Sequence, residues 1–401
     1  MNAQGKGLEQ HEILKVQLMR GEKEQDYLTH IWNLASMMDH PIIAKEEDQD
    51  EACYRQFYEE AISLCRQKRF HEVLEKCRYT SLDDEEEYSI DVIQPEKIEF
   101  KQNSYEDGEN SIISFPEFLL LVLDVCTGGE QPASHYQPDK LIEKFDALKT
   151  YFTAGEFYEK MLYYRLLLDY YTIRRDIKDG QGNYSLILKG PKDDSDKLKQ
   201  YQSMLYVSTE AFYNWLKPYL RKLEQDELHS CAEMLAFLKK EDNERHSILP
   251  ARKDLSYKAS GNIRYWFWRL DYYLWEQRST FFNEEEQKIV EHYVFRRNRS
   301  IEHLHPQDES HNEEWEEEAV HSFGNLAMIS QSFNSQQSND HIQIKFARIH
   351  EQISNKSLQS IKMFLMCKLA DFNYQNWTMK LAKEHENEMI EFLERSFYIS
   401  D

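Results

Sequence analysis

A short stretch in the C-terminal part of the sequence combines residue types that could hydrolyse a phosphodiester bond. Glu302 directly precedes His303, and two asparagines, Asn325 and Asn334, follow in the same region. A histidine has an unperturbed pKa of about 6.5, so it can take a proton from water near neutral pH. Carboxylate and amide oxygens suit Mg²⁺ or Mn²⁺, and a divalent cation neutralises the charge that gathers on a reacting phosphate. These residue types are therefore suited to metal-assisted hydrolysis.

The longer string around these residues resembles the HNH, or ββα-metal, nuclease motif. Its parts are IEHLHPQ at 301–307, Trp315, GNLAMIS at 324–330 and then Asn334. This string is similar to the nuclease half of the GmrSD-type, modification-dependent restriction enzymes. The resemblance implies a DNA endonuclease with a small ββα-metal domain near the C-terminus.

The resemblance also implies a role for each residue of the motif. His303 would be the general base, and Asn325 would hold its ring in one orientation. Glu302 and Asn334 would bind one Mg²⁺ or Mn²⁺ ion. Other residues of the segment could assist as accessory groups or contact DNA. The accessory candidates are His305, His321, Asn339 and Lys345, and the DNA-binding candidates are Arg296, Arg297 and Arg299.

The placement of Glu302 beside His303 predicts an irregular strand. Adjacent residues of a regular strand point to opposite faces, so these two could not act together from one face. Pro306 cannot donate a backbone hydrogen bond to a central strand. We therefore expect the strand to twist or to end close to His303.

The composition indicates a helical scaffold for this site. The 401 residues include only 12 glycines and 9 prolines, whereas average usage is about 7% and 5%. Few turn-forming residues argue against a many-stranded sandwich or barrel. We therefore expect a mainly α (α+β) protein.

Polar and turn-forming stretches near residues 130 and 250 divide the chain into three predicted regions. Residues 1–130 and 131–250 are expected to be helical, and the second region also carries a hairpin near 179–188. Residues 251–401 are expected to hold the HNH-like nuclease domain and its helical scaffold.

Local patterns predict several helices. Ser114, with Pro116 and Glu117 after it, is typical of a helix start. A long helical pattern runs from about 195 to 240. The aromatic segment 262–276 is similar to the scaffold helix that precedes the nuclease motif in the family.

The net charge of -23 argues against a surface coated with phosphate-binding residues. Residues 251–300 are the exception, because they carry ten Lys and Arg against seven Asp and Glu. We expect weak DNA binding by the chain alone. The six cysteines form no CxxC pair, and no stretch approaches 18 apolar residues. A cytoplasmic protein with reduced thiols and no membrane contact is expected.

The resemblance also predicts a partner subunit. The family's N-terminal domain carries an Asp-Gly-Gln-Gln-Arg motif, whereas this chain has only Asp179-Gly-Gln-Gly-Asn183, which we interpret as a turn. Residues 1–15 look like the element that follows that domain in single-chain members. We therefore expect no nucleotide site in this chain. A separate subunit would carry the nucleotide-dependent domain, and modified phage DNA would be the substrate.

Two alternatives stay open at this point. The chain could be a non-catalytic regulatory or DNA-binding subunit with a degenerate HNH site. It could also be an RNA-targeting nuclease toxin that uses the same fold.

Overall fold

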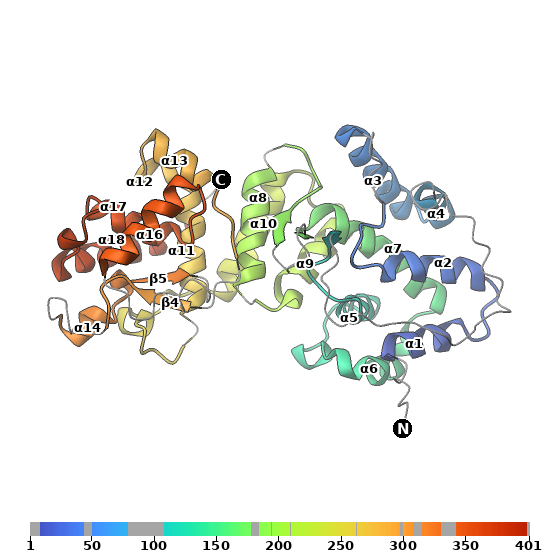
Figure 1. Ribbon diagram of the computed structural model, residues 1–401. Helices are drawn as coiled ribbons and strands as arrows, with labels where there is room; N and C mark the ends of the chain where they lie inside the picture. The colour runs from blue at the N-terminus through green and yellow to red at the C-terminus, as the bar shows by residue number, and fades with distance from the viewer. Residues whose placement is uncertain are drawn as a thin grey trace, which may run out of the picture. The chain divides into compact units, whose positions relative to one another are not determined.

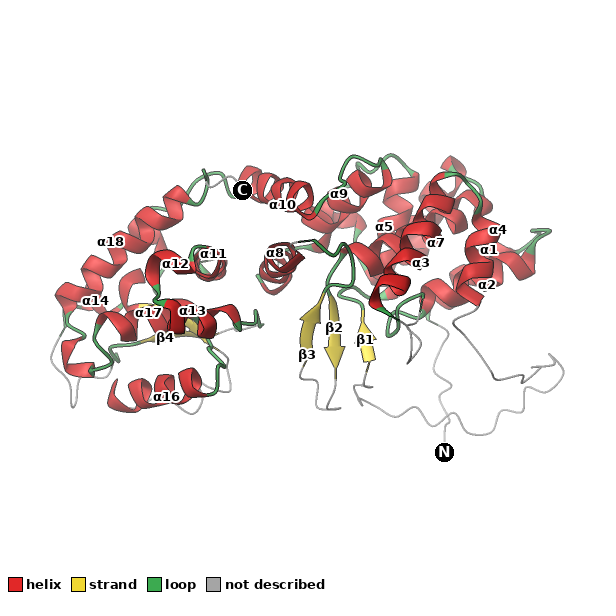
Figure 2. Cartoon of the chain, turned by 90° about the horizontal axis from the view of Figure 1, so that it is seen from above, coloured by secondary structure: helices red, strands yellow, loops and turns green. Residues whose placement is uncertain are grey.

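The computed structural model has the mainly helical fold that the composition predicts (Figures 1 and 2). It describes residues 9–43, 50–78, 108–177, 184–193, 195–208, 210–261, 263–296, 300–307, 315–329 and 342–398. The chain folds into two compact units. The N-terminal unit comprises Met1–Ser195 and Phe212–Cys231, and the C-terminal unit comprises Asp196–Ala211 and Ala232–Asp401.

The N-terminal unit is a helical assembly with one small sheet. Its helices are α1 (Gln10–Met19), α2 (Gln25–Ser36), α3 (Glu51–Arg66), α4 (Phe70–Arg78), α5 (Phe115–Cys126), α6 (Leu141–Leu148), α7 (Ala154–Tyr171) and α9 (Phe212–Glu224), with 3₁₀ turns η1 (Ala133–His135), η2 (Pro138–Lys140) and η3 (Lys149–Tyr151). Helix α7 is central, because it packs against α2, α3, α5 and α9.

Helix α5 begins where the sequence predicts. The Ser114 hydroxyl accepts a hydrogen bond from the Glu117 amide at 3.5 Å, and the Glu117 carboxylate accepts one from the Ser114 amide at 2.7 Å. This reciprocal capping satisfies two amides that the helix cannot pair. Residues 118–123 are fully buried, so α5 is a core helix. In the described part of the chain, no helix is long and apolar enough to cross a membrane.

The sheet of the N-terminal unit contains the strand predicted after residue 183. Strands β1 (Gly108–Asn110), β2 (Arg174–Ile177) and β3 (Tyr184–Ile187) pair antiparallel in that order (Figure 2). Residues 178–183, which include the predicted turn, lie outside the described residues.

The C-terminal unit carries the motif. Its elements are α8 (Ser195–Val207), α10 (Cys231–Arg245), η4 (Arg252–Leu255), α11 (Arg264–Glu276), α12 (Arg278–Phe281), α13 (Glu284–Glu291), β4 (Ser300–His303), α14 (Glu317–Val320), η5 (Phe323–Asn325), β5 (Leu326–Ile329), α16 (Ile342–Ser354), α17 (Ile361–Leu369), η6 (Tyr374–Asn376) and α18 (Met379–Arg395). The aromatic helix predicted at 262–276 is α11, which packs against α17, α18 and β5 (Figure 1).

The pattern from 195 to 240 is helical as predicted, and the structure divides it among three helices, α8, α9 and α10. Helix α9 ends close to Asp226, which has a left-handed backbone with φ of 57°. A non-glycine residue in this conformation stops helical hydrogen bonding. Helical periodicity continues across such a break, so the pattern alone did not reveal it.

Candidate functional site

The motif is built on a two-stranded antiparallel sheet. In the register of β4 and β5, Glu302 lies opposite Ala327 and His303 lies opposite Leu326. Strand β4 ends at His303, which agrees with the expected strand end. Glu302 and His303 are both buried, with 6% and 4% of their surfaces exposed. The sheet therefore places both residues in a protected site.

Asn325 holds the chain that leaves β4. Its Oδ1 accepts hydrogen bonds from the His305 amide at 2.8 Å and from Nε1 of Trp377 at 3.2 Å. Its Nδ2 donates to the carbonyl oxygens of His305 and Val320, each at 2.9 Å. These contacts use both lone pairs and both amide hydrogens of the side chain. Asn325 thus contacts the backbone beside His303 rather than its ring.

The ring of His303 has two other partners. Its Nε2 lies 3.1 Å from Nδ1 of His321, and its Nδ1 lies 2.9 Å from the amide nitrogen of Gln307. The same amide nitrogen also lies 3.3 Å from Nε2 of His303. The side chains of His321 and Gln307 thus both contact the His303 ring.

Burial keeps His303 neutral. Burial lowers the pKa of His303 to about 3, together with the nearby groups His321, Lys345 and His305, which act in the same direction. The pKa of His321 is also lowered, mainly by burial and then by Lys258. Both imidazoles are thus neutral at pH 7. A bound phosphate would raise the pKa of His303, because negative charge favours the imidazolium.

Lys345 lies in this site and not on a helix surface. It is 4% exposed, and its Nζ forms an ion pair with Glu302 and donates to the His303 carbonyl at 2.6 Å. The carboxylate of Glu302 suits a hard divalent cation, but here it already faces an ammonium. In the described ranges, no group of three or more His, Cys, Asp or Glu could hold a metal ion.

His305 and His321, the other accessory histidines, lie in different surroundings. The ring of His305 stacks on Trp315, with centroids 4.0 Å apart. The ring of His321 contacts the ring of His303. Since β4 ends at His303, the alternation of strand side chains does not carry His305 to the same face.

Sequence reasoning missed Tyr257 and Gln307. The Tyr257 ring meets the His303 ring edge-on at 4.6 Å and stacks on His321 at 5.8 Å. The Tyr257 amide and the Ser256 hydroxyl each donate to the His321 carbonyl at 3.0 Å. No motif could have indicated Tyr257, which is distant in sequence, whereas Gln307 stands inside the run IEHLHPQ.

The turn that carries Asn325 is stabilised by a buried lysine and by close packing on α18. Lys362 is fully buried, and its Nζ donates to the carbonyls of Phe323 at 2.8 Å and Leu326 at 2.6 Å. Gly324 lies so close to α18 that an added Cβ would overlap the carbonyl oxygen of Ala382. Sequence reasoning also missed these supports.

Some predicted site residues cannot be placed. Asn334, Asn339, Arg297 and Arg299 lie outside the described residues. Arg296 is described and exposed, so it is accessible to a ligand.

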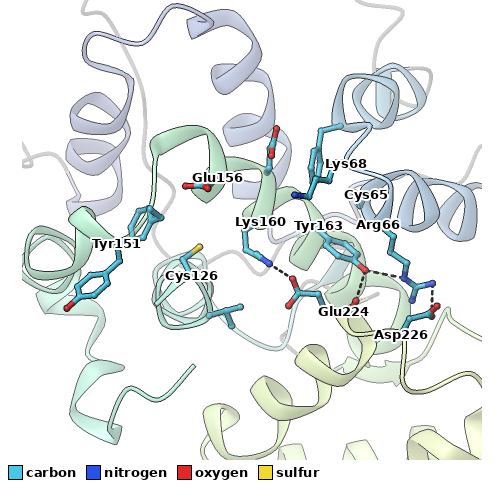
Figure 3. A pocket seen from close by; sticks show the side chains of 14 residues that line it. Cys65, Arg66, Lys68, Cys126, Tyr151, Glu156, Lys160, Tyr163, Glu224 and Asp226 are labelled. Atoms are coloured by element: carbon cyan, nitrogen blue, oxygen red, sulfur yellow. Dashed lines mark hydrogen bonds and ion pairs between the residues drawn. The ribbon is translucent and has the colours of Figure 1, made fainter. Parts of the chain in front are cut away.

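The N-terminal unit contains a cavity of about 680 Å³ with a mixed lining (Figure 3). Arg66 pairs with Asp226 at 2.9 Å, and Lys160 pairs with Glu224. Burial raises the pKa of the Cys126 thiol in its wall, which disfavours a reactive thiolate. The cavity thus has no feature that indicates phosphodiester chemistry.

Comparison with known proteins identifies the part of the chain that carries the site. Residues 240–392 match the family model described as GmrSD restriction endonucleases, C-terminal domain. No curated protein and no solved structure matches the chain.

Proposed function

Because residues 240–392 match the family model of the C-terminal domain of GmrSD restriction endonucleases, we propose that the chain is the DNA-cleaving subunit of an anti-phage restriction system. In this proposal it hydrolyses phosphodiester bonds of modified DNA, with His303 as general base and one Mg²⁺ or Mn²⁺ ion. The observation that carries the proposal is the buried His303 ring, which His321 and Gln307 contact beside the carboxylate of Glu302.

The geometry supports His303 as the proton acceptor. Gln307 is exposed, so a water molecule could replace its amide beside the His303 ring. The unprotonated nitrogen of that ring would take a proton from the water as the oxygen attacks phosphorus and the bond to the leaving oxygen breaks. A divalent cation held by Glu302 and Asn334 would neutralise the phosphate.

The charge distribution supports dependence on a partner. A chain with a net charge of -23 repels the DNA backbone, and phosphate contacts supply most non-specific affinity. A separate subunit that carries the nucleotide-dependent domain would bring the DNA to the site. A gel-shift titration should therefore show weak binding by the chain alone at physiological salt. Tight binding without a partner would contradict this part of the proposal.

The substrate class can be tested directly. Purified chain, alone and with a partner subunit, would be incubated with Mn²⁺ and labelled modified DNA, unmodified DNA or RNA. The proposal predicts cleavage of modified DNA above the other two. Preferential cleavage of RNA would favour an RNA-targeting nuclease instead.

One observation favours a second function. The ammonium of Lys345 already neutralises Glu302, as expected for a regulatory or DNA-binding subunit with a degenerate site. Calorimetric titration with Mn²⁺ distinguishes the nuclease from the regulatory subunit. Binding that Glu302→Ala abolishes supports the nuclease, and absence of binding to the wild-type chain supports the regulatory subunit.

A further inference from the structure

Tyr257 presents an exposed aromatic ring at the candidate site. It is 43% exposed, whereas His303 and His321 beside it are 4% and 9% exposed. Single exposed aromatic residues are common on protein surfaces, but this one lies against the candidate base. Its ring centroid is 4.6 Å from that of His303. A ligand that reaches His303 must therefore come close to the Tyr257 ring.

The ring of Tyr257 is held in place by the backbone and by His321. The Tyr257 amide donates to the His321 carbonyl at 3.0 Å, and Leu255, two residues earlier, is fully buried. The imidazole of His321 lies nearly parallel to the ring, with the two planes 15° apart. A ring fixed in this way loses little conformational entropy when a ligand binds. The two histidines cover only part of it, so a further planar group can stack there.

Basic residues stand beside Tyr257 in the sequence. The segment 252–258 carries three basic residues and one acidic residue, and its Lys253 and Lys258 are exposed. The ion pair that Lys258 forms with Glu317 is exposed as well. Such a pair is weak in water, so a phosphate can compete for the ammonium. Basic side chains beside an exposed aromatic ring are the combination that binds the backbone and the bases of a single nucleic-acid strand.

We propose that Tyr257 binds the substrate by stacking on a base next to the scissile phosphate. This inference rests on the proposed function, because only a nuclease places a scissile phosphate beside His303. Inside a duplex a base is stacked between its neighbours, so it must leave that stack to meet the ring. Every base has a π-face, so the contact tolerates any sequence. The substrate at the site is thus a locally opened DNA strand.

Fluorescence of 2-aminopurine tests the inference without any cleavage. This base loses emission when it stacks on another ring. The full-length chain would be titrated, at low ionic strength and with EDTA, into a single-stranded DNA oligonucleotide that carries 2-aminopurine between thymines. We expect binding with quenching. A wild-type chain that does not bind the oligonucleotide, or binds it without quenching, would overturn the inference and would leave the nuclease function to its own cleavage test.

Two substitutions at Tyr257 separate the ring from the hydroxyl. Tyr257→Leu removes the ring, so we expect about 5- to 100-fold weaker binding and loss of the quenching. Tyr257→Phe keeps the ring and should recover most of both. Tyr398→Leu is the matched control, because Tyr398 is 87% exposed near the C-terminus, and it should behave as the wild-type chain does. If Leu binds and quenches as the wild-type chain does, or if Phe fails as Leu does although both fold, no base stacks on Tyr257.

Discussion

The ammonium of Lys345 and the carboxylate of Glu302 form an ion pair that is almost completely shielded from solvent. Lys345 belongs to α16 and Glu302 to β4, so the pair joins the helix to the strand that carries His303. The same ammonium binds the His303 carbonyl. One lysine thus stabilises both the candidate metal ligand and the backbone of the candidate base.

Lys345→Met should strongly destabilise the C-terminal unit. The substitution leaves the Glu302 carboxylate buried without its counter-charge, and breaking a buried pair in this way costs about 3–5 kcal/mol. Chemical denaturation measures the loss. The double variant Glu302→Gln with Lys345→Met removes both charges and should recover part of it. Equal losses in the single and double variants would show that the charge is not the cause.

Gly324→Ala should also destabilise the protein, for a steric reason. The added methyl would overlap the Ala382 carbonyl and the Glu386 side chain, and α18 or the turn would have to move. We expect a loss of about 1–3 kcal/mol in the free energy of unfolding. Gly261→Ala is the matched control, because its Cβ would meet nothing within 4 Å. Similar losses from both substitutions would contradict the close packing of the turn.

Asn325→Ala should remove the hydrogen bonds that hold the loop after β4. It leaves buried partners in His305, Val320 and Trp377 without their hydrogen bonds, and each such group costs about 1–3 kcal/mol. We expect a loss of at least about 2 kcal/mol together with lower activity. Asn376 is an exposed residue, and Asn376→Ala removes a single part-buried hydrogen bond of 3.2 Å, so this variant should stay close to wild type. The account of Asn325 fails if the two variants unfold at the same denaturant concentration.

His385 predicts how stability varies with pH. It is 1% exposed, neither ring nitrogen has a hydrogen-bond partner among the described residues, and burial lowers its pKa well below 6.5. The unfolded chain takes up a proton near pH 6.5 and the folded chain does not. The contribution of His385 to the free energy of unfolding is therefore fully present above pH 6.5. It falls by about 1.4 kcal/mol per pH unit as the pH drops towards the pKa of His385 in the folded chain.

The variant His385→Leu should lose this part of the pH dependence. Urea midpoints from pH 7.5 to 5 would show a shallower decline than in the wild-type chain. His40→Gln serves as the control, because the His40 side chain is 62% exposed, and it should follow the wild-type profile. Parallel profiles for His385→Leu and wild type would mean that the buried ring is protonated in the folded state.

The sequence predicted the features that depend on local chemistry. Ser114 and Glu117 cap α5, the aromatic segment forms α11, and β4 ends at His303. Each depends on residues that are close together along the chain, where spacing carries the information.

Long-range contacts could not be predicted in the same way. Lysine is rarely buried without a partner, and only the packing of α16 shows that Glu302 is the partner of Lys345. Tyr257 reaches His303 and His321 through tertiary folding. The roles of Glu302, His303 and Asn325 stay predictions.

Single-turnover cleavage by the full-length chain tests the central claim most directly. Wild type, His303→Ala and His292→Ala, an exposed histidine near α13, would be compared on the same modified DNA with Mn²⁺ and a partner subunit. Loss of a general base predicts a rate at least about 100-fold lower for His303→Ala, and an unchanged rate for His292→Ala. Cleavage by His303→Ala at the wild-type rate would contradict the assignment of His303 as the base.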